Sequence, residues 1–202
     1  MRLDIITFDT CIVCDGLSIK GKTHIACQNQ FTPDSYISFF NYNKTARQII
    51  LKSKYGQKSY TLIDSLINLD ANLLKINSLG NVDIIVPVPM TKSIKKIKDM
   101  NHAMYIAYKI GRILKTPTID ILSKDSRLSQ KSLSGEYRKY HLKGKIKIKH
   151  ELINKIKNKS ILLVDDVLTT GATMIESTKV LKLNGTKSVK CLTLTKDEFN
   201  NV

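Results

Sequence analysis

The sequence predicts an α/β protein, with a parallel β-sheet flanked by helices and a small zinc-finger-like segment in front of it. Two apolar runs rich in β-branched residues, 82–89 and 160–164, are typical of buried parallel strands. Segments with helical spacing alternate with such runs, and this order favours a parallel sheet. Three cysteines cluster within the first 27 residues. We therefore expect a zinc-finger-like segment at 1–34 and an α/β domain at 35–202.

The expected elements follow from periodicity and from breaker residues. Gly56 separates the first two expected helices, and Asn184-Gly185 is typical of a helix C-terminus. Lys and Ile alternate in 145–149, which predicts an edge strand with one wet face. Residues 123–145 are polar and basic with no clear period, and a loop of this length is usually functional, often a lid. Strands are expected at 35–42, 82–89, 117–122, 145–149, 160–164 and 189–195, and helices at 45–53, 62–74, 100–114 and 171–183.

The charge of the chain is strongly positive and regional. The 202 residues include 33 Lys and Arg against 17 Asp and Glu, a net charge of +16. Residues 91–159 hold 19 of these bases and five of the acids. A basic face attracts polyanions such as nucleic acid, phosphorylated small molecules or anionic lipid. The alternative is compositional drift, since 28 of the bases are Lys.

Neither a membrane span nor a secretory signal is predicted. No uncharged apolar run approaches the ~18 residues that a transmembrane helix needs. The start, MRLDIITFDT, lacks a basic region followed by an apolar one. We expect a cytoplasmic protein, either free or at the inner face of the cytoplasmic membrane.

The cysteine cluster predicts a structural zinc site. Cys11, Cys14, His24 and Cys27 follow the pattern C-x2-C-x9-H-x2-C, with two short ligand pairs facing each other. Zn²⁺ takes four tetrahedral N/S ligands, so these residues can form a closed Cys3His site. The alternative is ordinary thiols beside a solvated histidine. Cys191 lies in an apolar run and is expected to be a core thiol.

The stretch 161–173 carries the strongest chemical signal. An apolar strand leads to Asp165 and Asp166, then to the small-residue turn Thr-Thr-Gly-Ala-Thr, then to a helix. Two adjacent carboxylates can accept hydrogen bonds from a vicinal diol. The turn offers hydroxyls and backbone N–H groups at a helix N-terminus, where phosphate binds well. Gly171 lets the backbone approach an anion closely. A diol beside a phosphate describes a ribose 5-phosphate.

This stretch resembles the signature of type I phosphoribosyltransferases, which bind phosphoribosyl pyrophosphate (PRPP). The resemblance implies a type I phosphoribosyltransferase-like fold and assigns Asp165 and Asp166 to the ribose hydroxyls as the catalytic pair. It also implies a 5-phosphate held by Thr169–Thr173 and Mg²⁺ bridging the pyrophosphate oxygens. The PRPP-binding set is then Asp165, Asp166, Val167, Leu168, Thr169, Thr170, Gly171, Ala172 and Thr173, with a pyrophosphate loop at Pro89, Met90, Thr91 and Lys92.

Other features resemble the ComF (ComFC) competence family, which combines this fold with an amino-terminal zinc finger. They are Pro87-Val-Pro89 before a basic stretch, the cysteine cluster and further residues along the chain. Three departures stand out, one of which is Arg138-Lys-Tyr-His141 where the family often has Arg-x-x-Asn. The chain has Lys98-Asp-Met-Asn101-His102 where the family commonly has Arg-Gly-Phe-Asn-Gln, and His24 where it often has a fourth Cys. The further residues are Tyr42, Lys52, Tyr55, Asn101, Arg127, Ser129, Gln130 and Arg138.

Two functions from different classes follow. The resemblance implies a competence protein that binds PRPP and single-stranded DNA during natural transformation, together with proteins of the DNA-uptake machinery. The alternative is an enzyme, a phosphoribosyltransferase that joins phosphoribose to a nucleobase or amine. Tyr137 and Tyr140 are the preferred base-stacking candidates, whereas Tyr105 and Tyr108 are equally explained by packing along a helix. The expected DNA-contacting bases are Lys92, Lys95, Lys96, Lys98, Arg127, Lys131, Arg138 and Lys139.

Overall fold

The structure is a computed structural model and describes residues 3–55, 60–90, 101–124 and 144–197. Its centre is a four-stranded parallel sheet in the order β1-β6-β5-β2. The four strands are β1 (Ser35–Asn41), β2 (Ile84–Pro87), β5 (Ser160–Leu168) and β6 (Ser188–Lys196). Parallel pairing explains why these strands read as continuous apolar runs, because helices cover both of their faces.

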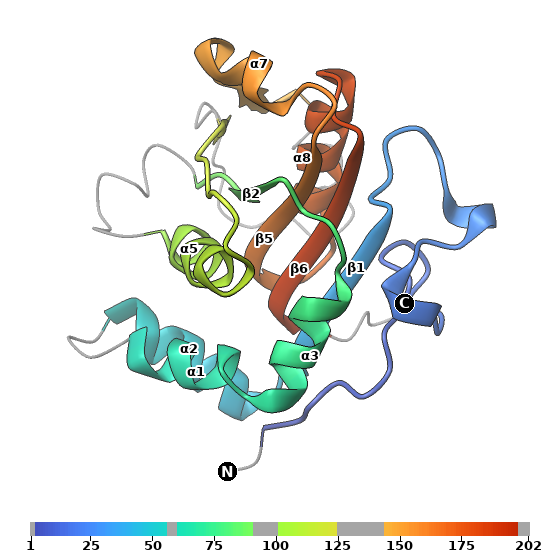
Figure 1. The fold of residues 1–202 in the computed structure, drawn as a ribbon. Coiled ribbons are helices and arrows are strands. Elements are labelled where there is room, and N and C mark those ends of the chain that lie inside the picture. The colour runs from blue at the N-terminus through green and yellow to red at the C-terminus, as the bar shows by residue number, and fades with distance from the viewer. Residues whose placement is uncertain (1–2, 56–59, 91–100, 125–143, 198–202) are drawn as a thin grey trace.

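Helices cover the sheet on two sides (Figure 1). One side carries α1 (Lys44–Tyr55), α2 (Tyr60–Ile67), α3 (Asp70–Ser78) and α5 (His102–Leu114). The other carries α8 (Ala172–Leu183) and an antiparallel ribbon of β3 (Leu122–Lys124) and β4 (Ile146–Ile148). A short α7 (Ile153–Ile156) follows the 3-10 turn His150–Leu152. The expected α/β fold of type I phosphoribosyltransferase-like layout is confirmed.

Each strand divides its side chains between two apolar cores. In β5, Ile161 and Leu163 join the core beneath α8, whereas Leu162 and Val164 join the core beneath α5. This division follows from the two-residue period of a strand. In β4, Ile146 and Ile148 are buried while Lys147 is exposed, as the Lys/Ile alternation predicts. Cys191 is fully buried in the first core, so the expected core thiol is confirmed.

The single helix expected at 62–74 is wrong, because two helices occupy this region. Leu69 has an extended backbone (φ −64°, ψ 136°) and separates α2 from α3. The buried side chain of Asn72 donates from Nδ2 to the carbonyl of Leu66 at 2.7 Å. This bond satisfies a carbonyl that a continuing helix would have used. The apolar period survives the break, since Ile63, Leu66 and Ile76 still reach one core.

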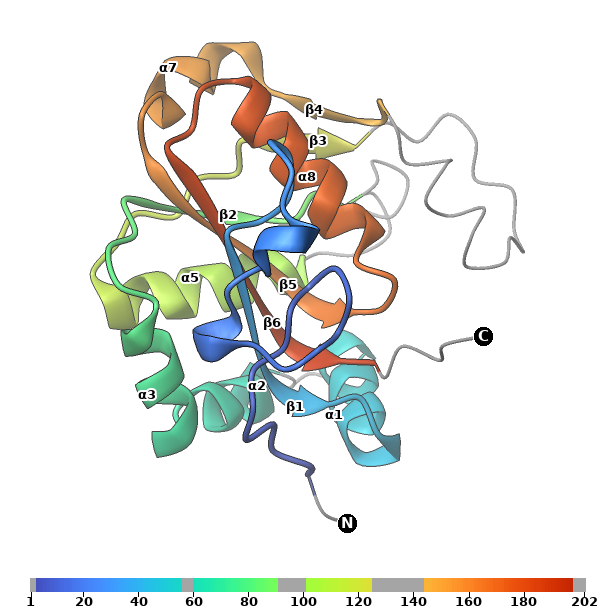
Figure 2. The same ribbon diagram turned by 90° about the vertical axis from the view of Figure 1, so that its right-hand side faces the viewer.

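The N-terminal segment lies along the outer edge of β1 (Figure 2). Ile5 pairs with Phe40 in an antiparallel bridge, and Lys22 pairs with Ser35. Asp34 ties the end of the segment to the sheet, because it accepts from the backbone N–H of Val189 at 2.6 Å and from Lys182 Nζ at 2.9 Å. The division into 1–34 and 35–202 stays a prediction.

None of the helices within the described ranges is long and apolar enough to span a membrane.

Candidate functional site: an acid pair beside a glycine turn, and a thiol-rich metal centre

The two aspartates lie within β5, which ends at Leu168, four residues beyond the strand end that the sequence predicts at 164. Both are half-buried. The backbone N–H of Asp166 donates to Oδ1 of Asp165 at 2.9 Å. Asp165 pairs in register with Thr193 of β6, and Thr195 donates from Oγ1 to the carbonyl of Asp166 at 3.3 Å. Because β5 lies between two other strands, both carboxylates are held at the carboxyl end of the sheet, where open α/β sheets bind ligands.

The turn between β5 and α8 has the geometry of an anion cradle. Gly171 is the N-cap of α8 and has a left-handed backbone, with φ +69°. Ala172, Thr173 and Met174 follow it in the first helical turn, where backbone N–H groups have no partner within the helix. Thr169 is exposed and Thr170 and Thr173 are half-buried. The predicted phosphate-binding turn thus places a left-handed glycine before a helix N-terminus, an arrangement that favours anions in general, and its assignment to the 5-phosphate of PRPP stays a prediction.

Lys124 is a cation near this site that sequence reasoning missed. It ends β3, and burial lowers its pKa while the negative charge of Asp165 acts in the opposite direction. The ribbon is tied to α8 because the backbone N–H of Gly144 donates to Glu176 Oε1 at 2.9 Å. The position of Lys124 depends on how β3 folds over the sheet, so no local signal in the sequence could have identified it.

The expected pyrophosphate loop is described only in part. Pro89 is buried and Met90 half-buried, at the end of a backbone that follows β2. Asn101 caps α5 by accepting from the N–H of Ala103 at 3.0 Å, and it donates from Nδ2 to the carbonyl of Val88 at 3.4 Å. Asn101 therefore connects the start of α5 to Val88, the residue that follows β2. Thr91 and Lys92 lie outside the described residues.

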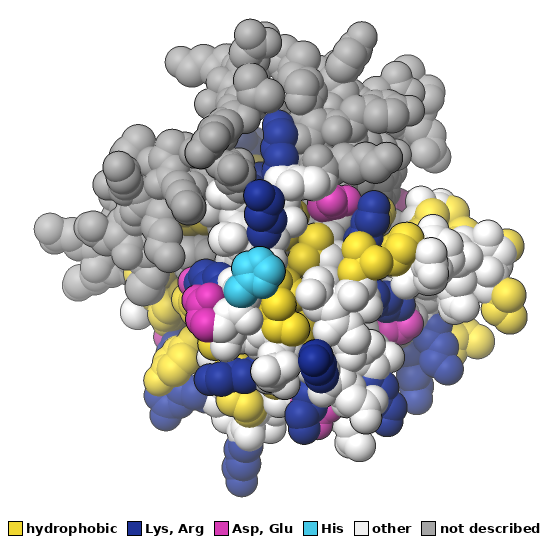
Figure 3. Space-filling view, turned by 90° about the horizontal axis from the view of Figure 1, so that it is seen from above, with side chains coloured by type: hydrophobic (Ala, Val, Ile, Leu, Met, Phe, Trp, Pro, Cys, Tyr) yellow, Lys and Arg dark blue, Asp and Glu magenta, His cyan; other side chains and the backbone are white. Residues whose placement is uncertain are grey.

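The predicted DNA-contacting bases cannot be placed. Lys92, Lys95, Lys96, Lys98, Arg127, Lys131, Arg138 and Lys139 all lie outside the described residues, as do Tyr137 and Tyr140. Within the described surface, Lys and Arg side chains recur across the face shown in Figure 3, whereas Asp and Glu are few there.

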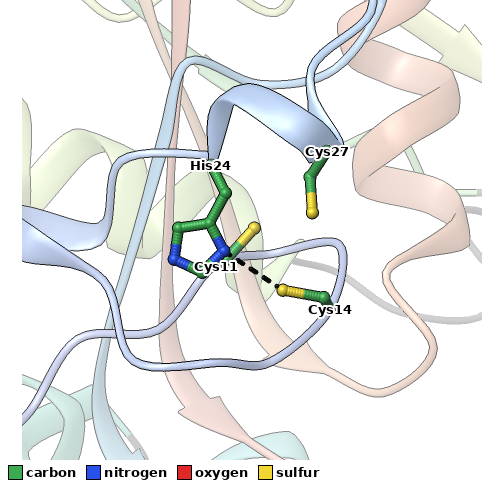
Figure 4. Close-up of side chains that lie close together, drawn as sticks. All are labelled: Cys11, Cys14, His24 and Cys27. Carbon is green, nitrogen blue, oxygen red and sulfur yellow. Dashed lines mark hydrogen bonds between the residues drawn. The ribbon is translucent and has the colours of Figure 1, made fainter.

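The four predicted metal ligands come together. The ligand atoms of Cys11, Cys14, His24 and Cys27 all lie within 4.8 Å of one another, and their side chains converge (Figure 4). Tetrahedral Zn–S bonds of about 2.3 Å require ligand atoms about 3.8 Å apart, so the donor set and its spacing fit zinc. Hydrogen bonds between the backbones of Cys11, Asp15 and Gly16 form the first short turn.

His24 is oriented for ligation through Nδ1. Its Nδ1 lies 3.3 Å from Cys14 Sγ, and its Nε2 lies 2.9 Å from the carbonyl of Leu17. A carbonyl only accepts, so Nε2 carries the proton and Nδ1 presents a lone pair to the thiols. A histidine ligand held by such a second hydrogen bond is typical of protein zinc sites.

The thiols of Cys14 and Cys27 differ in acidity. A hydrogen bond from the backbone of Gly16 lowers the pKa of the Cys14 thiol. The hydrogen bond with Cys14 raises the pKa of Cys27 to about 11. Closely spaced thiols resist losing both protons unless a cation neutralises them, so this cluster favours a bound divalent metal.

Comparison with known proteins finds a domain family and a curated relative. Residues 100–198 match the phosphoribosyl transferase domain family. Competence protein F of Haemophilus influenzae is 27% identical over 110 residues, which are 54% of this chain and 48% of that protein. The chain thus spans about half the length of this curated relative.

Two solved structures are similar at a low level. The allosteric regulatory enzyme of purine biosynthesis matches with a TM-score of 0.40 and 18% identity, over 60% of this chain and 23% of that one. Adenine phosphoribosyltransferase from Leishmania tarentolae matches with a TM-score of 0.38 and 14% identity, over 66% of this chain and 74% of that one. The chain is thus similar to competence protein F and to phosphoribosyl transferase domains, and it carries a Cys/His cluster in its N-terminal segment.

Proposed function

We propose that this protein binds PRPP and single-stranded DNA, and that it supports DNA uptake into the cytoplasm as a ComF-like competence protein. The observation that carries the proposal is the acid pair at the end of β5 next to the left-handed Gly171 turn. A diol acceptor and an anion cradle on one strand–turn–helix unit suit a ribose 5-phosphate.

In this proposal each part of the unit has one role. Asp165 and Asp166 accept hydrogen bonds from the ribose hydroxyls, and residues 169–173 donate to the 5-phosphate. Lys124 places a positive charge beside the carboxylates and offsets part of their repulsion toward an anionic ligand. Mg²⁺, when bound with PRPP, would neutralise the pyrophosphate, since it prefers substrate oxygens and waters.

DNA binding is supported by charge. Residues 91–159 carry 19 bases against five acids. Such a segment neutralises phosphates and releases counterions, without reading sequence. The competence role, the uptake-machinery partners and contact with the inner membrane face are proposals that rest on the similarity to competence protein F.

Calorimetric titration with PRPP and Mg²⁺ tests the sugar-phosphate site. Asp166→Asn removes a charged acceptor and should weaken binding by about 1–3 kcal/mol, or roughly 5- to 150-fold. Asp70→Asn, an exposed acid at the start of α3, is the matched control and should bind as the wild type does. Equal affinities for all three proteins would overturn the assignment of the acid pair.

Titration of labelled single-stranded oligonucleotides at several salt concentrations tests DNA binding. A protein that neutralises several phosphates loses affinity steeply as salt rises. An affinity that barely changes between low and moderate salt would contradict the DNA-handling role. PRPP binding would be unaffected by that outcome.

Phosphoribosyl transfer is the second candidate function, and Lys124 is the observation that favours it. Lys124 interacts electrostatically with Asp165, and a cation at this end of the sheet can stabilise negative charge that develops on a departing group. Incubation with PRPP, Mg²⁺ and a panel of nucleobases and amines, followed by a pyrophosphate assay, separates the two functions. Robust turnover with one acceptor would favour the enzyme, and no release would favour binding without turnover.

A further inference from the structure

A small cavity opens between α2 and α5, away from the acid pair. It has a volume of about 170 Å³ and is lined by Asp64, Ile67, Asn68, Lys109, Arg112 and Ile113. Arg112 lies 10 residues beyond the first residue of α5, or about 15 Å along the helix axis. Since α5 begins beside the predicted pyrophosphate loop, the cavity lies toward the opposite end of the helix.

The only acid of the cavity is already neutralised. Asp64 accepts from Tyr105 Oη through one oxygen at 2.7 Å and from Lys109 Nζ through the other at 2.8 Å. That contact also raises the pKa of Lys109, which stays charged. Arg112 is exposed, and none of the ion pairs found within the described ranges involves it. The cavity therefore has a net positive charge from Arg112.

The cavity combines an apolar floor with a polar rim. Ile67 is 1% exposed and forms the floor together with Ile113. Asn68 is exposed at the rim, and its amide can both donate and accept. Pockets for drug-sized ligands have about 300–1,000 Å³. A cavity of this size takes a single ring or side chain that belongs to a larger molecule.

The neighbouring surface favours a nucleic acid as that molecule. Tyr108 is 55% exposed and lies one turn before Arg112 on the same face of α5, and Lys115 is exposed just beyond the helix. An exposed aromatic ring among cations is the arrangement on which single-stranded bases stack. The exposure of Tyr108 also shows that packing along the helix does not account for this residue.

We propose that the α2/α5 cavity receives one base of a single-stranded nucleic acid, with Asn68 contacting the base edge and Arg112 an adjacent phosphate. Tyr108 stacks on a neighbouring base. The proposal rests on the DNA-binding function proposed above, and it adds a place where the strand is held by a base and not only by phosphates.

Fluorescence anisotropy with two oligonucleotides tests this proposal. Both have about 12 nucleotides, within the usual site sizes, and one of them carries abasic sites throughout its central part. The wild type should bind the intact strand at least about 5-fold more tightly than the abasic strand. Asn68→Ala should lose part of that preference, the rest coming from stacking on Tyr108, while its affinity for the abasic strand stays unchanged.

Two charge variants complete the test. Arg112→Gln should weaken binding of the intact strand more than Lys115→Gln, the matched control, which removes one charge outside the cavity.

Wild-type protein that binds no oligonucleotide would refute the proposed DNA function itself. Wild-type protein that binds intact and abasic strands equally, or Asn68→Ala that keeps the full preference, would refute the cavity proposal alone. Displacement of DNA by an acidic peptide from wild type but not from Arg112→Gln, without any preference for bases, would assign the cavity to a peptide instead.

Discussion

At the scale of single residues, glycine is needed at position 171 because of the backbone conformation there, and not because a side chain would clash with its neighbours. A Cβ at this position would meet only Leu168 Cδ1 at 3.7 Å and Ile175 Cδ1 at 3.8 Å, which are ordinary contacts. The cost of a side chain comes from φ +69°, which L-residues rarely adopt. The turn that we assign to the 5-phosphate is therefore shaped by this residue.

Gly171→Ala should lower stability by about 1–2 kcal/mol and weaken PRPP binding as the turn relaxes. Gly80→Ala is the matched control, because Gly80 has φ +64° and lies away from the turn. It should cost similar stability without changing PRPP affinity. Calorimetry with PRPP and thermal unfolding measure the two effects. A Gly171→Ala protein with unchanged affinity would show that the turn does not hold the phosphate.

Cysteine reactivity separates the core thiol from the cluster. Burial raises the pKa of Cys191 to about 12, whereas Cys14 is exposed and Cys27 half-buried. Since the thiolate is the reactive form, Cys191 should not react in the folded protein at neutral pH. After metal removal, a thiol reagent should label Cys14 quickly, Cys27 more slowly because its pKa is raised, and Cys191 only in denaturant. Peptide mass mapping reads out the sites, and rapid labelling of Cys191 in the native protein would contradict its buried position.

Cysteine should replace His24 as a zinc ligand, whereas alanine should not. His24→Ala removes one ligand of four and should lose zinc, whereas His24→Cys keeps a complete set of donors. Metal analysis of the purified proteins measures zinc per chain. Stoichiometric zinc in His24→Ala would show that histidine is not a ligand, and loss of zinc in both variants would point to a packing role for the imidazole ring.

At the scale of elements, the break between α2 and α3 shows how one buried amide changes a helix into two. Asn72 is 1% exposed, and its Nδ2 donates to the carbonyl of Leu66. The apolar period of 62–74 predicts one helix because it continues through the break. Periodicity reports which side chains face the core, but not whether the backbone between them stays helical.

Asn72→Ala should destabilise the protein by about 1–3 kcal/mol, because the carbonyl of Leu66 then keeps only the long 3.5 Å hydrogen bond from the N–H of Leu69. Ser65→Ala is the control. Ser65 also donates to a helix carbonyl, that of Thr61, but at an exposed position, so it should cost less than about 0.5 kcal/mol. Urea denaturation compares the two variants. Equal midpoints for both would show that the break is maintained by packing alone.

At the scale of the whole molecule, Lys196 connects the Cys/His cluster with the end of the strand that carries the acid pair. It is 8% exposed at the end of β6, pairs with Asp15 beside Cys14 and donates from Nζ to Thr10 Oγ1 at 2.9 Å. The same residue pairs in register with Leu168, and the N–H of Asp197 donates to the carbonyl of Leu168 at 2.8 Å. The strand end that carries the acid pair is thus bonded to the segment that holds the four candidate metal ligands.

Lys196→Met should weaken zinc retention and PRPP binding together, because it leaves the carboxylate of Asp15 without its partner and loosens the end of β6. The expected stability loss is about 1–3 kcal/mol. Lys187→Met, on an exposed residue, is the control and should change neither property. Competition with a zinc chelator and calorimetry with PRPP provide the two readouts. A fall in zinc retention with unchanged PRPP affinity would separate the two sites.

The sequence alone was sufficient to predict the features that depend on residues close together in the chain. Strands β2 and β5, helices α5 and α8, and the four metal ligands were predicted, because period, capping and short ligand spacing are local properties. The acid pair and its glycine turn are contiguous for the same reason. Their roles in binding stay predictions.

Features that join distant parts of the chain emerged only from the folded structure. Lys124 comes near Asp165 because the β3–β4 ribbon folds over one face of the sheet. Lys196 reaches Asp15 across 181 positions, and Lys109 meets Asp64 across 45. Partners so far apart leave no periodic or spacing signal, since their contact depends on how helices and strands pack together. The strand–turn–helix unit was thus predictable from the linear sequence, whereas the partners of Lys109, Lys124 and Lys196 were decided by how the elements pack in the folded chain.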